Sequence, residues 1–239
     1  MQHDSLHCIP MTQSSFTALE KIIGIRFKNK DLLAQSLTHR SAARQARALG
    51  HNERFEFLGD AVLELIATDY LFYMGQKSEG EMTNLRSALV NRENLANVAR
   101  EIKLGEYLFM SKGEERSGGR EKDSTLANAL EALIGAIYLD QGFEKVQTFC
   151  NEFILTRLSG LLAEGKDRDQ KSLFQERAQE HCGVTPHYDV VDQEGPDHDK
   201  IFTCAVFIGE EQVAVGRGNS KQRAETSAAD AGLKAKGWQ

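Results

Sequence analysis

The spacing of apolar residues changes once along this chain, and that change limits the folds open to it. From about residue 16 to residue 160, apolar side chains recur every three or four positions, as in Leu19, Ile22 and Ile23. This period is typical of amphipathic helices. Between residues 188 and 215, apolar residues instead form short runs rich in β-branched and aromatic types, as strands do. The chain therefore predicts a helical domain followed by a mixed one.

A polar stretch at residues 161–169 separates the two patterns and predicts a linker, because it has no apolar periodicity. An all-α domain would then span residues 1–160, and a second domain residues 170–239. The elements expected in the second domain are a helix at 173–181, strands at 188–192, 201–208 and 212–215, and a helix at 224–236. About seventy residues in this α-β-β-β-α order are enough for one small α+β domain.

The composition excludes several classes of protein. With 41% hydrophobic and 27% charged residues, the composition is that of an ordinary soluble globular protein. Because the net charge is -6, any surface that binds nucleic acid must be a local basic patch. Four scattered cysteines lack the paired spacing of a zinc site: Cys8, Cys150, Cys182 and Cys204. We expect reduced thiols in a cytoplasmic protein. Residues 1–13 show no secretory pattern, and the longest apolar stretch, 126–139, is too short to span a membrane.

Three acids recur on one face of a predicted helix. Glu53, Glu56 and Asp60 stand at i, i+3 and i+7, which places their side chains within roughly 60° of one another. Apolar residues cover much of the remaining circumference, so we expect a helix buried on several sides. Crowded carboxylates in such surroundings repel one another and resist desolvation, so a cation would stabilise them. The alternative is a solvated acidic face, which is the common case for acids at helical spacing.

A second helix adds to this constellation. Between residues 126 and 139, Asn128 and Glu131 are the only strongly polar side chains, and they lie three apart on one face. If the two helices pack together, Glu56, Asp60, Asn128 and Glu131 converge. Such an all-oxygen set suits Mg²⁺ or Mn²⁺. Carboxylate-held ions of this kind can activate water and neutralise the leaving oxygen in phosphodiester hydrolysis.

Other segments indicate local structure. Ser78 and Glu81 fit a capping box, and acids at a helix start, including Glu79, are favoured by the helix dipole. Residues 112–123 are charged and rich in glycine, which predicts a solvated loop. Asp123 and Ser124 are then expected to cap the next helix. For His39, a structural hydrogen bond is the favoured role.

The segment Gly216–Arg223 has three basic residues and no acid. It lies at a predicted strand-to-helix junction, where backbone N–H groups and the helix dipole favour phosphate. Lys221 and Arg223 would add point charges. The alternative is an ordinary helix start, since basic residues are common there.

Several of these segments resemble known families. Residues 52–63 resemble the signature of bacterial ribonuclease III, and residues 37–41, 79–82 and 130–135 resemble further segments of that family in the same order. The second domain, with Pro186-x-Tyr188, Gly195–His198 and Gly218–Lys221, resembles a double-stranded RNA-binding domain. The resemblance implies a homodimeric, Mg²⁺-dependent endonuclease that cuts double-stranded RNA and leaves 5′-phosphate and 3′-hydroxyl ends. It also implies precursors of ribosomal and messenger RNA as substrates.

The resemblance also implies roles for individual residues. Those implied for the first domain are Asp60 and Glu131 as catalytic residues, Glu56, Asp60, Asn128 and Glu131 as metal ligands, Glu53 and Glu79 as substrate-contacting acids, and Phe57 in the dimer interface. Those implied for RNA binding are Gln175, Glu176 and His198 in minor grooves, and Lys221 and Arg223 on phosphates. Asn128 departs from the aspartate common in the family, so we expect a retained but weaker metal site. Gln222 replaces a common basic residue, which predicts somewhat weaker RNA binding.

Two other functions remain open at this point. A non-cleaving RNA-binding or scaffold protein with a decayed nuclease site is favoured by Asn128 alone. Retention of the buried acids argues against it. A helical bundle stabilised by Ca²⁺ lacks an EF-hand loop and leaves the second domain unexplained.

Overall fold

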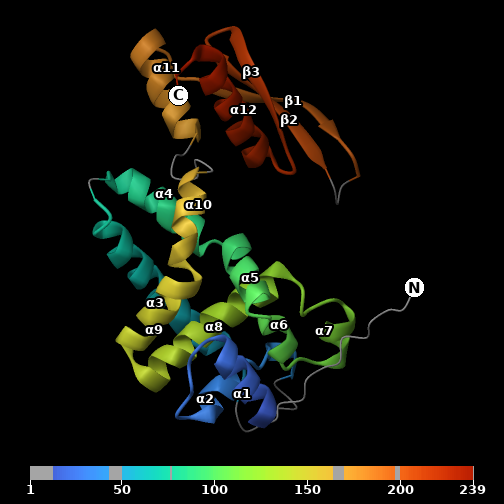
Figure 1. The fold of residues 1–239 in the computed structure, drawn as a ribbon. Coiled ribbons are helices and arrows are strands. Elements are labelled where there is room, and N and C mark those ends of the chain that lie inside the picture. The colour runs from blue at the N-terminus through green and yellow to red at the C-terminus, as the bar shows by residue number, and fades with distance from the viewer. Residues whose placement is uncertain (1–12, 43–49, 76, 164–169, 197–199, 239) are drawn as a thin grey trace. The chain divides into compact units, whose positions relative to one another are not determined.

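A computed structural model describes residues 13–42, 50–75, 77–163, 170–196 and 200–238. The chain divides into two compact units, Met1–Gly165 and Lys166–Gln239, and Figure 1 shows helices in the first and a sheet with two helices in the second. The predicted fold class, an all-α domain followed by a small α+β domain, is confirmed.

The first unit is built from helices around one hydrophobic core. Its helices are α1 (Gln13–Ile22), α2 (Lys30–Ser36), α3 (Glu53–Phe72), α4 (Glu79–Val90), α5 (Arg92–Glu101), α6 (Leu104–Tyr107), α7 (Lys112–Arg116), α8 (Asp123–Gln141), α9 (Phe143–Phe153) and α10 (Leu158–Ala163), with 3-10 turns η1 (Arg40–Ala42) and η2 (Leu155–Arg157). Helix α8 is buried on nearly all sides, as its almost continuous apolar sequence requires.

Two glycines let α3 and α8 pack backbone against backbone. A β-carbon on Gly59 of α3 would lie 1.8 Å from the carbonyl oxygen of Glu131. A β-carbon on Gly135 of α8 would lie 2.4 Å from the carbonyl oxygen of Phe55. Because no larger residue fits at either point, the crossing of the two helices is fixed beside the carboxylates.

Two predictions of local structure in the first unit are wrong, and a third is confirmed. Residues 112–116 form α7 instead of a loop, because the hydroxyl of Ser111 accepts from the N–H of Glu114 and starts a single turn. Asp123 and Ser124 do not cap α8: Lys122 is the N-cap residue and makes no capping bond, and the Asp123 carboxylate pairs with Arg100 instead. The capping box of Ser78 and Glu81 is confirmed.

The expectation that α3 is buried on several sides holds for only part of its surface. Val62, Leu63 and Ile66 are buried, but Phe57 is 82% exposed and Leu65 57% exposed. An apolar strip of α3 therefore lies uncovered within a single chain.

The end of α10 differs from the predicted linker. The helix continues through Ala163, and Leu161 is buried, so the first three residues of the stretch predicted as linker belong to the helical unit. The sequence did not predict this, because the polar residues that follow Leu161 mask the apolar periodicity at the end of α10.

The second unit has the predicted element order. Its elements are α11 (Gln170–Cys182), β1 (His187–Glu194), β2 (Ile201–Ile208), β3 (Glu211–Gly218) and α12 (Lys221–Lys236), with an antiparallel sheet in the order β1-β2-β3. Phe174 and Leu233 from the two helices pack on Val206 of β2. Helix α12 starts three residues earlier than predicted, because the hydroxyl of Ser220 accepts from the N–H of Arg223.

Candidate active site and RNA-binding surface

Helices α3 and α8 bring four of the predicted site residues together. The side chain of Asn128 on α8 hydrogen-bonds to Glu56 on α3. Glu131, one turn further along α8, interacts electrostatically with both Asp60 and Glu56. The close contact at Gly59 sets this geometry, since Gly59 precedes Asp60 and its contact on α8 is the backbone of Glu131.

The constellation has an excess of negative charge. Burial, with the charges of Asp60 and Glu56, raises the pKa of Glu131 from 4.5 to about 7, although Arg92 opposes the shift. Burial and the neighbouring Glu53 also raise the pKa of Glu56, against the hydrogen bond from Asn128. The neighbouring carboxylates thus disfavour ionisation of Glu56 and Glu131, and added positive charge would relieve this cost.

The donor set fits a hard divalent cation in its chemistry, since it consists of three carboxylates and one amide. Within the described ranges, however, no three His, Cys, Asp or Glu side chains are gathered closely enough to hold an ion as they stand. Coordination would therefore require the carboxylates on α3 and α8 to turn toward a common point, or the Asn128 oxygen to complete the set.

A cleft of about 590 Å³ adjoins these acids and shares Glu56 and Asn128 with them. Its other lining residues come from η1, the start of α3, α7 and the start of α8, and they include Arg40 and Lys122. His39 also lines the cleft, and its Nδ1 lies 2.9 Å from the Ser41 hydroxyl oxygen, which matches the hydrogen-bonding role expected for it.

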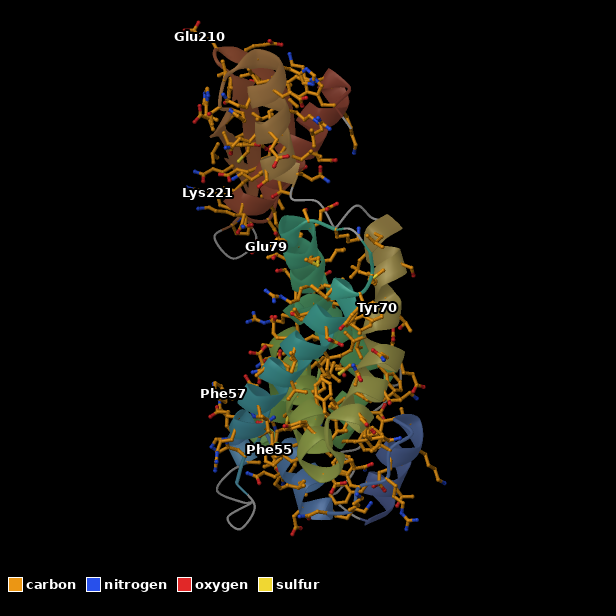
Figure 2. All side chains as sticks on the ribbon, turned by 90° about the vertical axis from the view of Figure 1, so that its left-hand side faces the viewer. Phe55, Phe57, Tyr70, Glu79, Glu210 and Lys221 are labelled. Carbon is orange, nitrogen blue, oxygen red and sulfur yellow. The ribbon has the colours of Figure 1, made fainter. Side chains whose placement is uncertain are left out.

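The two acids predicted to contact substrate lie in different places. Glu53 lines the cleft and pairs with Arg40, with 3.6 Å between charged atoms. Glu79 lies in the first turn of α4. Figure 2 shows Glu79 at the far end of the helical unit from Phe55, so the structure does not bring it to the other acids. Phe57, on the outer side of α3, points into solvent (Figure 2).

In the second unit, two separate regions carry the predicted RNA contacts. Gln175 and Glu176 are exposed on α11 and line a shallow groove there. Lys221 and Arg223 are exposed in the first turn of α12. His198 lies outside the described residues.

Comparison with known proteins identifies both units. A family model described as Ribonuclease-III-like matches residues 29–158, and one for the double-stranded RNA binding motif matches residues 170–235. Ribonuclease 3 of Campylobacter fetus is 43% identical over 88% of this chain and 93% of its own length. The chain belongs to the ribonuclease III family. Ribonuclease 3 of Pelotomaculum thermopropionicum is also 43% identical, over 94% of this chain and 95% of its own.

A solved structure of this family matches the helical unit. It is the nuclease domain of ribonuclease III from Campylobacter jejuni, described for structural flexibility in the region involved in dimer formation. It is 44% identical with a TM-score of 0.55, and the match covers 58% of this chain and 95% of that domain. The chain thus combines a ribonuclease-III-like domain with a double-stranded RNA binding motif.

Sequence reasoning missed part of the cleft. The sequence predicts a solvated loop around Glu114 and Lys122, whereas both residues line the cleft beside the acids. Periodicity could not find them, because Glu114 lies in a helix too short to show an apolar period and Lys122 lies at the N-cap of α8.

Proposed function

We propose that this chain is a Mg²⁺-dependent endoribonuclease that cuts double-stranded RNA as a homodimer. The observation that carries the proposal is the meeting of Glu56, Asp60 and Glu131 across two helices locked together at Gly59. We further propose 5′-phosphate and 3′-hydroxyl products, precursors of ribosomal and messenger RNA as substrates, and action in the cytoplasm. Reduced Cys150 and Cys204, both buried, agree with that compartment.

Mg²⁺ would be held by Glu56, Asp60, Asn128 and Glu131, with Mn²⁺ as a substitute, and would supply an activated water and neutralise charge on the phosphate. The protein's own contribution is positional. Asn128 donates to Glu56, which holds that carboxylate toward α8 and leaves the amide oxygen able to face a cation. Asp60 and Glu131 are the proposed catalytic residues, because they stand opposite each other at the fixed crossing.

The test is incubation of the purified protein with long duplex RNA, in Mg²⁺ or in chelator, followed by mapping of the ends. We expect cleavage in Mg²⁺ only. Binding without cleavage in either condition would contradict the proposal and favour the non-cleaving scaffold, for which the amide at position 128 is the one argument.

Replacing Asn128 by aspartate is expected to lower the Mg²⁺ concentration needed for half-maximal cleavage, because a carboxylate adds charge to the ligand set. The hydrogen bond to Glu56 would be lost, so the effect should be modest, about tenfold. Mg²⁺ titration of cleavage by the wild type and Asn128→Asp measures it. An unchanged titration would show that residue 128 is not a ligand.

The exposed apolar strip of α3 is the proposed dimer interface. Phe57, Leu65 and Phe72 are all more than half exposed, and a subunit partner would bury them. Phe57→Asp is expected to shift the protein toward monomer in light-scattering measurements at micromolar concentration. Lys21→Gln, at an exposed position of α1, is the control and should leave the mass unchanged. A monomeric wild type would refute the homodimer.

In the second unit, Gln175, Glu176 and His198 are proposed to meet minor grooves, and Lys221 and Arg223 the phosphates between them. Lys221→Gln and Arg223→Gln should each weaken duplex binding without regard to sequence. Each should also reduce the slope of log K against log salt by about one. Lys234→Gln, near the other end of α12 in an ion pair with Asp230, is the matched control. Equal salt slopes for all three variants would contradict the assignment.

A further inference from the structure

The cleft beside the acids is polar throughout. All ten residues that line it carry charged, amide, imidazole or hydroxyl side chains. Sites for small organic ligands are instead lined mainly by apolar side chains. A cleft lined only by polar side chains, and sharing Glu56 and Asn128 with the carboxylate site, is better suited to bind the charged backbone of a nucleic acid.

His39 lines this cleft, and its hydrogen bonds fix the tautomer of its ring. The N–H of Ser111 donates to the Ser41 hydroxyl oxygen at 3.0 Å, and the N–H of Ser41 donates to His39 Nδ1 at 3.2 Å. The Ser41 hydroxyl, which lies 2.9 Å from Nδ1, is then directed to donate there as well. Because Nδ1 accepts, the ring proton resides on Nε2. That N–H is the group His39 can offer to a molecule in the cleft.

Arg40 and Lys122 flank the same space, each in a partly exposed ion pair, and Lys122 also donates to the Ser117 hydroxyl oxygen at 3.3 Å. Arg40 is 73% exposed and lies 3.6 Å from Glu53, while Lys122 donates to Glu114 at 2.9 Å with 46% of its side chain exposed. Exposed ion pairs of this kind contribute little to stability. A phosphate can therefore replace either carboxylate partner at small cost, and Arg binds phosphate through two parallel hydrogen bonds.

The start of α8 also faces the cleft. Ser124 and Thr125, in its first turn, line the cleft, and no side chain caps this turn. Asp123, the acid at the same helix start, is paired with Arg100. The helix dipole and first-turn N–H groups thus add to the attraction for an anion.

We propose that this cleft binds a backbone phosphate of the RNA next to the linkage that is cut, through Arg40, Lys122 and the Nε2–H of His39. This inference rests on the proposed function, because it locates part of that substrate. We assign the phosphate to a neighbouring linkage because the cleft shares Glu56 and Asn128 with the carboxylate site, whereas Asp60 and Glu131 do not line it.

The first experiment measures single-turnover cleavage of a defined RNA duplex in Mg²⁺ by the full chain. Arg40→Gln and Lys122→Gln are expected to lower kcat/KM about tenfold to a hundredfold, the range for loss of one charge-assisted hydrogen bond. His39→Gln, which keeps a side-chain N–H, should lose less activity than His39→Leu. Lys21→Gln removes one positive charge at an exposed position of α1 and should match the wild type. Thermal unfolding of each variant verifies that it is folded.

The second experiment removes the charge from the RNA instead. Duplexes carrying one uncharged methylphosphonate linkage, moved stepwise away from the cleavage site, are cut by the wild type, Arg40→Gln and Lys122→Gln. At one position beside the cut, the modification should slow the wild type but add little to the defect of the two variants, because the same contact is already lost.

The results separate this inference from the proposed function. If the wild type cuts RNA while Arg40→Gln and Lys122→Gln behave like Lys21→Gln, or if methylphosphonate effects multiply at every position, the phosphate site is wrong and the nuclease stands. A wild type that cuts no duplex in Mg²⁺ overturns both.

Discussion

Replacing Glu131 by glutamine is expected to lower cleavage of duplex RNA on the order of a thousandfold, the scale for losing a group that stabilises transition-state charge. The same change should make the protein more stable when Mg²⁺ is chelated. Glutamine keeps the size of the side chain but removes a charge that burial, Asp60 and Glu56 all disfavour. A residue kept for function at a cost in stability has these opposite effects.

The stability gain depends on pH in a defined direction. The pKa of Glu131 rises from 4.5 to about 7 on folding, so the folded state favours the protonated form. Stability from that proton is fully present below pH 4.5 and is lost as pH rises through about 7. At 1.36 kcal/mol per pKa unit, allowing for partial exposure, Glu131→Gln should stabilise the chelated protein by about 2 kcal/mol at pH 8 and by almost nothing at pH 4.5.

Thermal unfolding in chelator at several pH values, together with single-turnover cleavage, measures both effects. Glu144→Gln is the control: it removes a carboxylate in the first turn of α9, outside the constellation, and should leave cleavage unchanged. A Glu131→Gln protein that cuts RNA at the wild-type rate would remove Glu131 from the catalytic residues. Equal stability of wild type and Glu131→Gln at pH 8 would show that the ionised Glu131 carboxylate does not destabilise the folded protein.

Helical periodicity was sufficient to predict which acids face one another. Glu56 and Asp60 share a face of α3 because they are four residues apart, and Asn128 and Glu131 share a face of α8 because they are three apart. The structure joins these two faces. The predicted roles of the residues as metal ligands remain predictions, since they depend on a bound ion.

Three features could not be read from the sequence. The exposure of Phe57 is implied only by the family resemblance, because by its pattern alone an apolar residue on a helix fits a core as well as an interface. The cleft joins residues from four segments, and one of them, α7, is too short to show a period. A glycine such as Gly59 has no side chain from which a neighbour could be inferred, although it fixes the crossing of α3 and α8.

Substitution of Gly59 is expected to have the largest effect on folding. Gly59→Ala would place a β-carbon 1.8 Å from the Glu131 carbonyl oxygen, a backbone atom that cannot move aside alone. Helices α3 and α8 must then separate, which opens the core and pulls the carboxylates apart. We expect a loss of at least about 3 kcal/mol, a large part of the stability of an ordinary domain. Gly135→Ala, which meets the Phe55 carbonyl oxygen from the other helix, should act in the same way.

Gly80→Ala is the matched control, because Gly80 is also helical but a β-carbon there meets nothing within 4 Å. Alanine favours helix over glycine, so this variant should be unchanged or more stable by up to about 1 kcal/mol. Denaturant unfolding followed by circular dichroism measures all three variants. The second unit has its own core of Phe174, Val206 and Leu233, so Gly59→Ala should still bind duplex RNA while losing cleavage. If Gly59→Ala unfolds like Gly80→Ala and still cuts RNA, then α3 and α8 do not meet at this glycine, and the geometry that brings the carboxylates together would have to be abandoned.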